Sequence, residues 1–242
     1  MNQATSVVGN TISAFGFSGK RIEDLTANGY TLADIEIDLS PSTSGFRKEL
    51  EAALAAIVDS LNKSPRSENM LVRVETFDEK LKEVHGFVNL TDVKAADYKL
   101  KPSGGGTALY DSILCGIEAV GAYGEQLDKM EYDVNGVVFI VTDGEENSSS
   151  KASIAKILSS NEQIQRAEHL ESLKVVLIGI GDQARVKSYL EKLKKDAKLD
   201  QYVWVGDASP SNLAKLADFI SRSISSASNS LGTGGASQNL DF

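Results

Sequence analysis

The stretch DLSPS at positions 38–42 places one carboxylate and two hydroxyls at alternating positions. Side chains of an extended chain alternate between two faces, so Asp38, Ser40 and Ser42 point the same way if the backbone stays extended. Two further polar residues stand in other motifs: Thr107 follows three glycines in PSGGGT, and Asp143 ends the apolar run GVVFIVTD. All five carry short oxygen donors, which are the ligands that Mg²⁺ and Mn²⁺ prefer.

The charge of this set leaves room for one more ligand. Asp38 and Asp143 supply two negative charges and the hydroxyls supply none, so a bound dication would be neutralised and no more. Mg²⁺ takes about six oxygen ligands and keeps water where the protein supplies none. If one acid binds through water, a carboxylate from another molecule becomes a favourable ligand. The set therefore predicts a metal site that accepts a foreign acid.

The elements that position these residues follow from the spacing of apolar side chains. This spacing predicts strands at 31–38, 70–77, 84–90, 136–143, 174–181 and 202–206. It predicts helices at 46–62 (with Ser44 as the cap), 108–127, 151–171, 183–196 and 210–226. Alternating strands and helices indicate an α/β fold with a doubly wound, mostly parallel central sheet, one antiparallel edge strand and helices on both faces. In such sheets, ligands bind outside the carboxyl ends of the strands.

Composition narrows the class of function. The 242 residues are 41% hydrophobic and 24% charged, and the formal net charge of −9 argues against a general phosphate-binding surface. The single cysteine, Cys115, excludes an internal disulfide and is expected to be a small buried hydrophobe. His85 and His169 are isolated, which argues against zinc ligation. No apolar run reaches the ~20 residues of a membrane span, and the N-terminus does not resemble a secretory signal, so we expect a cytoplasmic protein.

The chain is expected to contain one folded domain with two loose ends. Residues 1–29 lack a sustained hydrophobic period and are expected to form a weakly ordered N-terminal arm. Residues 30–226 form the predicted domain. Residues 227–242 are rich in Ser, Gly and Asn and are expected to form a flexible tail.

The combination of motifs resembles the von Willebrand factor A (vWA) domain family, which has a Rossmann-like fold. The metal-ion-dependent adhesion site (MIDAS) of that family consists of Asp-x-Ser-x-Ser after the first strand, a Thr in a later loop, and an Asp closing a central strand. This chain matches with DLSPS, with Thr107 in GGGTALYDSI and with Asp143 in FIVTDGEENSS. The pattern is more similar to intracellular bacterial and phage-type members than to extracellular ones. The resemblance covers residues 30 to about 226.

The resemblance implies specific roles for the five residues. Ser40 and Ser42 would bind the metal directly, and Asp38 would often act through water. Thr107 and Asp143 would exchange direct and water-mediated roles as the site changes state. The implied function is a non-enzymatic module that binds an Asp or Glu of a protein partner, such as an ATPase or a multiprotein assembly, and neither nucleic acid nor membrane.

Two other functions stay open on the sequence. The first is a Mg²⁺-dependent phosphoryl-transfer enzyme of haloacid dehalogenase type, although that chemistry wants a second acid where this chain has Ser40. The second is a structural assembly protein with an inactive metal site. Single residues also have simpler interpretations: Thr107 as the cap of the helix at 108, Asp111 as an exposed helix residue or an anchor for the Thr107 loop, and Glu145 and Glu146 as a solvated rim.

Overall fold

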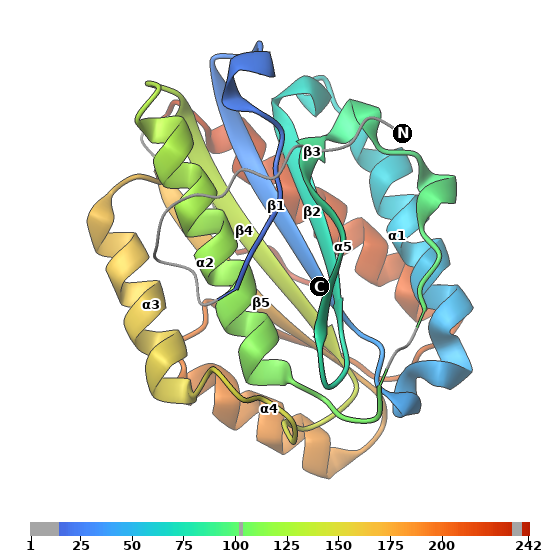
Figure 1. The fold of residues 1–242 in the computed structure, drawn as a ribbon. Helices are drawn as coiled ribbons and strands as arrows, with labels where there is room; N and C mark the ends of the chain where they lie inside the picture. The colour runs from blue at the N-terminus through green and yellow to red at the C-terminus, as the bar shows by residue number, and fades with distance from the viewer. Residues whose placement is uncertain (1–14, 102–103, 234–238) are drawn as a thin grey trace.

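A six-stranded sheet forms the centre of the protein, with the strand order β3-β2-β1-β4-β5-β6 (Figure 1). The computed structural model describes residues 15–101, 104–233 and 239–242. The strands are β1 (Gly29–Asp38), β2 (Met70–Phe77), β3 (Leu81–Asn89), β4 (Asp133–Thr142), β5 (Ser172–Ile180) and β6 (Gln201–Val205). All neighbouring pairs are parallel except the β2–β3 hairpin at one edge. The predicted doubly wound, mostly parallel sheet with one antiparallel edge strand is confirmed.

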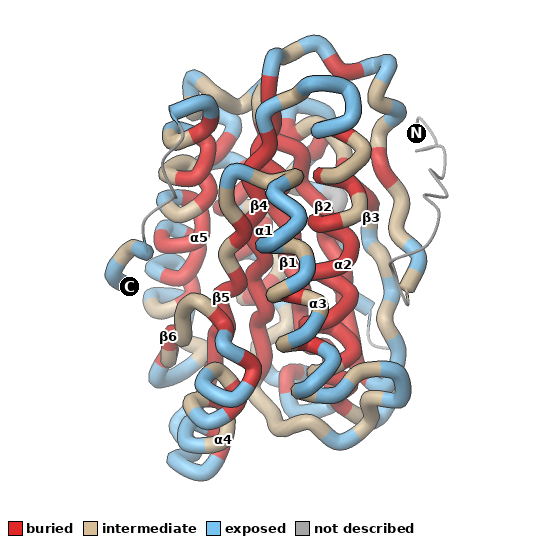
Figure 2. The backbone as a smooth tube through the Cα atoms, turned by 90° about the vertical axis from the view of Figure 1, so that its left-hand side faces the viewer, coloured by how far each residue is buried: buried red, intermediate tan, exposed pale blue. Residues whose placement is uncertain are grey.

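Helices cover both faces of this sheet, and each face has its own apolar core. The helices are α1 (Arg47–Leu61), α2 (Leu109–Asp128), α3 (Ile154–Ala167), α4 (Ala184–Asp196) and α5 (Pro210–Ser230). Apolar residues of α1 and α5 pack on one face, and those of α2, α3 and α4 pack on the other. The buried strands between these layers are visible in Figure 2. None of the helices in the described part of the chain has the length and hydrophobicity for a membrane crossing.

The strand order reverses beside β1, which creates the usual ligand position of this architecture. The chain leaves β1 through α1 on one face to form β2, whereas β4 joins the other side of β1 after α2 on the opposite face. Near their carboxyl ends the two strands are in register, with Ile37 opposite Val141. In open α/β sheets the loops diverge at such a switch point and leave a crevice there. The residues that follow β1 and β4 therefore meet at one place.

Local boundaries differ from the sequence prediction where polar turns compete with regular structure. Residues Pro41–Phe46 form a 3₁₀ turn before α1, and Ser44 is not the cap of that helix. The hairpin turn is tighter than expected because Asp78 bonds to Lys80 through both its backbone and its carboxylate. Strand β3 consequently begins at Leu81, inside the segment expected to be the turn.

Both chain ends contact the domain where they are described, and the expectation of a weakly ordered arm and a flexible tail stays a prediction. Phe87 of β3 exchanges backbone hydrogen bonds with Ser18 and Lys20 at 2.9 and 2.7 Å, so the arm covers the β3 edge. Helix α5 continues four residues beyond the expected end of the domain. Phe242 then packs against Phe219 of α5 at 5.8 Å between ring centroids. Residues 1–14 and 234–238 lie outside the described residues.

Candidate metal site at the strand ends

Asp38 stands at the end of β1, where the strand leaves the sheet, and is only 1% exposed. Its Oδ1 accepts a hydrogen bond from the backbone N–H of Ser40 at 2.7 Å. Its Oδ2 accepts a hydrogen bond from the hydroxyl of Thr142, the last residue of β4, at 2.6 Å. Asp38 is thus more than a turn residue, because a second strand fixes its carboxylate at the junction of β1 and β4.

Ser40, Ser42 and Asp143 form a line of oxygens beside Asp38. The hydroxyls of Ser40 and Ser42 are 3.0 Å apart, and Ser42 Oγ donates to Asp143 Oδ1 at 2.7 Å. This bond joins the loop after β1 to the residue that follows β4. Neither serine side chain caps the 3₁₀ turn or α1. Both hydroxyls therefore belong to the oxygen cluster rather than to a helix end.

Thr107 reaches the same space from a third segment. A Cβ placed on Gly144 would lie 3.6 Å from Thr107 Oγ1 and 3.9 Å from Asp38 Oδ2, so both oxygens border one small volume. The loop before Thr107 passes close to the loop after β4. A Cβ on Gly106 would lie 1.8 Å from Ser148 Oγ, so the third glycine of GGGT allows the two loops to approach closely. The five predicted residues are brought together at this edge.

The loop after β4 positions Thr107 and the start of α2, which the sequence did not indicate. The Asn147 amide oxygen accepts from the Thr107 backbone N–H at 2.8 Å, and the Asn147 N–H donates to the Thr107 carbonyl at 3.0 Å. Glu146 accepts from the backbone N–H of Tyr110 at 2.8 Å, in the first turn of α2. A carboxylate is favourable at a helix N-terminus. Glu146, rather than Thr107, therefore caps α2, and the interpretation of Glu146 as a solvated rim residue is wrong.

Asp111 anchors the far end of that loop. It accepts hydrogen bonds from the backbone N–H groups of Ser150, Lys151 and Ala152 at 2.9, 3.0 and 2.6 Å. The residue is buried in the first turn of α2. Asp111 thus positions the loop that follows Asp143, whereas the sequence interpretation was an exposed residue or an anchor for the Thr107 loop.

Burial makes the charged forms of the two site carboxylates, Asp38 and Asp143, less favourable. Burial raises the pKa of Asp38 to about 6, and the neighbouring charge of Asp143 adds to the rise. Burial also raises the pKa of Asp143, although the hydrogen bond from Ser42 opposes it. Among the described residues, no Lys, Arg or His forms an ion pair with either carboxylate. Arg185, at the rim, is held by Glu145 through two bonds of 2.9 Å.

The donor set fits a hard divalent cation. Two carboxylates and three hydroxyls converge, and nitrogen and sulfur take no part in this set. Mg²⁺ and Mn²⁺ favour such oxygen donors, and a dication would offset the two acids that lack a counter-charge. Both histidines are engaged elsewhere: His85 with Tyr98, and His169 with Asp128.

A second group of acids lies deeper in the sheet and surrounds one arginine. Arg73 of β2 is fully buried and contacts Asp34 and Glu36 of β1 at 2.9 Å each. It also pairs with Glu75, and with Glu83 of β3 at 3.1 Å. Burial raises the pKa of Asp34 and Glu36, and it raises the pKa of Glu75 to about 7. We call Asp34, Glu36, Arg73, Glu75 and Glu83 the interior ion cluster.

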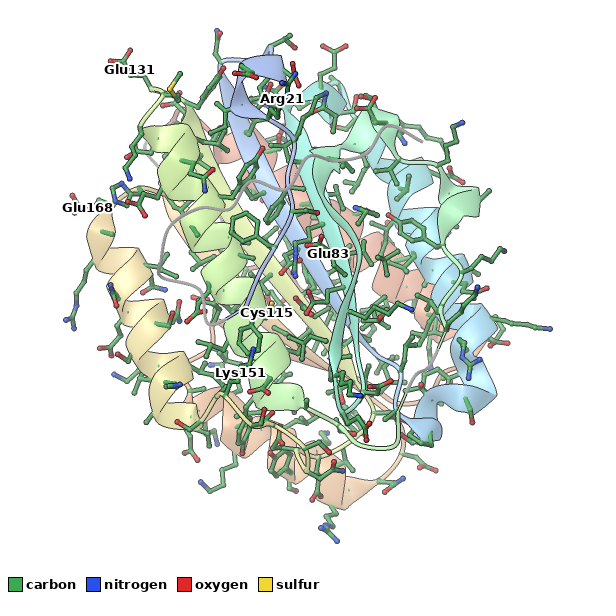
Figure 3. All side chains as sticks on the ribbon, in the orientation of Figure 1. Arg21, Glu83, Cys115, Glu131, Lys151 and Glu168 are labelled. Carbon is green, nitrogen blue, oxygen red and sulfur yellow. The ribbon has the colours of Figure 1, made fainter. Side chains whose placement is uncertain are left out.

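Cys115 of α2 borders the interior ion cluster; Figure 3 labels Cys115 and Glu83. Its Sγ lies 3.5 Å from Arg73 and 3.8 Å from Glu75. The cysteine is buried, as expected, but beside charges. Glu36, Glu75 and Cys115 bring possible ligand atoms within 4.8 Å of one another. Arg73 already binds both carboxylates, so this trio has a cationic partner inside the protein, which it shares with Asp34 and Glu83.

Comparison with known proteins identifies the fold. No protein-family model matches the chain, and neither does any curated protein sequence. Solved structures do match. Proximal thread matrix protein 1 of the mussel byssus has a TM-score of 0.54 and 20% identity over 83% of this chain and 46% of its own. A mutant of the PilB minor pilin from Streptococcus sanguinis has a TM-score of 0.60 and 14% identity over 87% of this chain and 64% of its own.

A third structure, an aerotolerance-related membrane protein from Bacteroides fragilis, has a TM-score of 0.54 and 14% identity over 81% of this chain and 98% of its own. This chain has the vWA fold. It spans about half the length of the mussel protein. One structure of that protein, with a TM-score of 0.53, has a MIDAS motif occupied by zinc. A chain with the vWA fold thus holds a divalent metal at a MIDAS in that case.

Proposed function

We propose that this protein is a metal-dependent binding module of the vWA fold, which holds a Mg²⁺ or Mn²⁺ ion at a MIDAS and binds a carboxylate of a protein partner. The residues that would hold the ion are Asp38, Ser40, Ser42, Thr107 and Asp143. The observation that carries the proposal is the convergence of these oxygens at the β1–β4 switch point, where no basic residue of the described ranges forms an ion pair with them.

The protein's own contacts support a preformed site with one side open. Asp38 is buried and fixed by Ser40 and Thr142, whereas Ser42 is exposed and Asp143 is half-buried. A bound dication would supply Lewis acidity toward an incoming carboxylate, because the protein contributes only two negative charges. The exposed side at Ser42 and Asp143 is where a partner's Asp or Glu would approach.

We further propose that the module is not an enzyme. The haloacid dehalogenase alternative needs a second acid two residues after its nucleophile, and Ser40 stands there with its hydroxyl beside Ser42. Matrix proteins and pilins are among the structures that share the fold. The partner class implied by the sequence resemblance, an ATPase or a multiprotein assembly in the cytoplasm, is part of the proposal.

Calorimetric titration and affinity capture test this function together. We expect the wild-type protein to bind one Mg²⁺ per chain and to capture proteins from native lysate that EDTA releases. Thr107→Ala and Asp143→Ala should lose both properties, and Asp59→Asn, an exposed change on α1, should keep both. Capture that persists in EDTA, or in both site variants, would contradict a metal-dependent module. Turnover of small phosphoesters that requires Asp38 would favour the phosphatase instead.

A further inference from the structure

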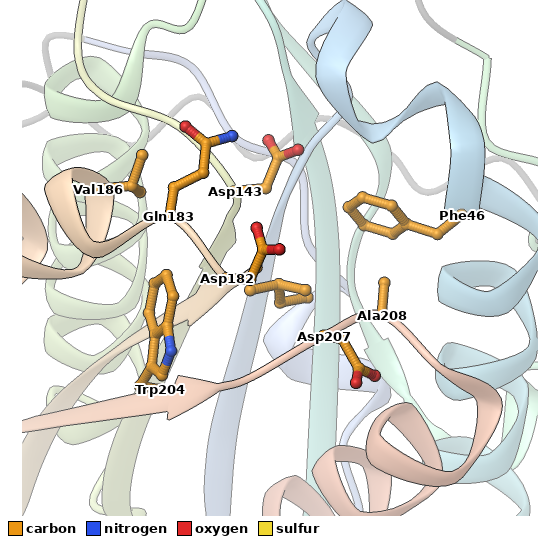
Figure 4. A pocket seen from close by; sticks show the side chains of 10 residues that line it. Phe46, Asp143, Asp182, Gln183, Val186, Trp204, Asp207 and Ala208 are labelled. Atoms are coloured by element: carbon orange, nitrogen blue, oxygen red, sulfur yellow. The ribbon is translucent and has the colours of Figure 1, made fainter.

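A small pocket opens beside the metal site and shares Asp143 with it (Figure 4). Its volume is about 270 Å³, just below the ~300–1,000 Å³ of most small-molecule sites. Such a volume suits a single side chain better than a drug-sized ligand. The pocket lies between the start of α1, the end of β5 and the loop after β6, so it borders the face where a partner's carboxylate would approach.

Five of the ten residues that line the pocket are apolar, and two of these are aromatic. Phe46, the residue before α1, faces the pocket from one side, and the indole of Trp204 of β6 faces it from the other. Ile180, Val186 and Ala208 add aliphatic surface. Aromatic faces attract the flat guanidinium of arginine and the ammonium of lysine, and tryptophan does so best.

Asp182 gives the pocket a negative charge without a counter-ion. Its carboxylate lies between Asp143 and Trp204 in Figure 4, and among the described residues nothing donates a hydrogen bond or an ion pair to it. Asp207 also lines the pocket, but its carboxylate accepts bonds from Ser209 and Asn212 at 2.8 and 2.9 Å. Asp182 is therefore the acid that is available to a ligand.

We infer that this pocket binds a basic side chain, preferably arginine, from the same partner segment whose carboxylate binds at the metal site. The cation pairs with Asp182 while its aliphatic stem and planar head pack on the apolar surface to which Phe46 and Trp204 contribute. Because Asp143 belongs to both the pocket and the metal site, the partner's acid and base must lie within a few residues of each other. This inference rests on the proposed function and specifies the chemistry of the partner.

A random peptide library displayed on phage tests this inference without knowledge of the partner. The immobilised protein is panned in Mg²⁺, and bound phage are eluted with EDTA. Wild-type protein should enrich sequences that carry an Asp or Glu together with an Arg or Lys close by. Asp182→Asn should still enrich the acid but lose the enrichment of the base. Asp59→Asn removes an equal charge from an exposed site on α1 and should behave as wild type.

A selected peptide resynthesised with citrulline in place of arginine gives the quantitative result. Citrulline keeps the shape and removes the charge, so binding to the wild type should weaken on the order of tenfold. Binding to Asp182→Asn should weaken clearly less, because only the contact of the cation with the aromatic rings is then lost. Acid enrichment without base enrichment, or base enrichment that survives Asp182→Asn, would overturn the pocket assignment and leave the metal-dependent function intact. Absence of any EDTA-eluted acidic sequence would overturn the proposed function and this inference with it.

Discussion

The interior ion cluster and the strand-end site both contain carboxylates from β1, yet they differ in one decisive respect. Asp34, Glu36 and Asp38 are every second residue of β1, so they lie on the same face of the strand. The first two contact the guanidinium of Arg73 at 2.9 Å. Asp38, at the end of β1, accepts hydrogen bonds from Thr142 and Ser40 and forms no ion pair with any basic residue that the structure describes. The interior acids share one arginine of the chain itself, whereas the strand-end acids form no ion pair with a described Lys, Arg or His.

This difference separates a structural group from a binding group. A buried ion cluster costs desolvation energy, and its own arginine partly offsets that cost. The strand-end acids have no such compensation from the part of the chain that the structure describes, so a cation from solution is most favourable there. The comparison predicts that removing a charge from the interior ion cluster will lower stability, whereas removing one from the strand-end site will weaken metal binding.

The largest effect is expected from the loss of the interior cation. Arg73→Met leaves Asp34, Glu36 and Glu75 buried without their partner, and we expect a loss of about 3–5 kcal/mol in unfolding free energy. Urea denaturation measures this change. Arg222→Met, which breaks an exposed pair with Asp218 on α5, should cost less than about 1 kcal/mol. Equal effects of the two substitutions would remove the distinction between interior and surface charges.

Metal binding should depend on the acids at the strand ends and not on those of the interior ion cluster. At a concentration about 100 times its dissociation constant, Mg²⁺ should raise the unfolding free energy by about 2.7 kcal/mol. Asp38→Asn and Asp143→Asn should abolish this increase, because each removes one of the two charges that a dication requires. Glu75→Gln, in the interior ion cluster, should keep it. Urea denaturation with Mg²⁺ and with EDTA measures the increase. If Asp38→Asn and Asp143→Asn both keep the increase, the assignment of the metal site is contradicted.

The pH dependence should change sign when metal is added. The pKa of Asp38 is raised from 3.8 to about 6 in the folded protein, so the folded state holds this proton more tightly than the unfolded state. Without metal, the stability contributed by the protonated group is complete below pH 3.8 and is lost as the pH rises through 6. With Mg²⁺ the carboxylate is needed, so the affinity should fall roughly tenfold per pH unit below 6.

The difference in unfolding free energy between wild type and Asp38→Asn isolates this group from others with raised pKa values, such as Glu75. Measured in EDTA across the acid range, that difference should favour the wild type less as the pH rises. A difference that stays constant through pH 6 would show that burial of Asp38 does not perturb its titration.

The smallest effect is expected in the loop that supports the site. Asn147→Ala removes the side-chain acceptor for the Thr107 backbone N–H, which should cost about 0.5–1.5 kcal/mol of stability. Mg²⁺ affinity, measured by calorimetry, should weaken by less than in either rim aspartate variant, because the ligands remain. Asn239→Ala serves as the control: it removes an exposed acceptor for Lys174, so it should cost less stability than Asn147→Ala and leave the Mg²⁺ affinity unchanged.

The sequence predicted the five site residues because each lies at the end of a strand, in the loop just after it, or after a glycine-rich loop, and parallel strands bring their carboxyl ends to one edge. It did not predict the roles of Glu146 and Asn147, because their partners, Tyr110 and Thr107, lie in a segment far away along the chain. The loop geometry that joins them has no local pattern.

The sequence pattern did not predict the interior ion cluster either. The alternating acids in TLADIEID are typical of a strand with one solvated face, but α2 covers that face. Gly116 of α2 permits this close packing, since a Cβ there would lie 2.7 Å from Asp34 Oδ2. The pairing that makes such burial possible comes from Arg73 on another strand, and only the register of β1 with β2 reveals it.

Anomalous diffraction from crystals grown with Mn²⁺ tests the central claim most directly, because it locates the ion among the two groups of acids. The account predicts a single strong peak bordered by Asp38, Ser40, Ser42, Thr107 and Asp143. A peak at Glu36, Glu75 and Cys115 instead, or no peak at the strand ends at saturating Mn²⁺, would contradict it.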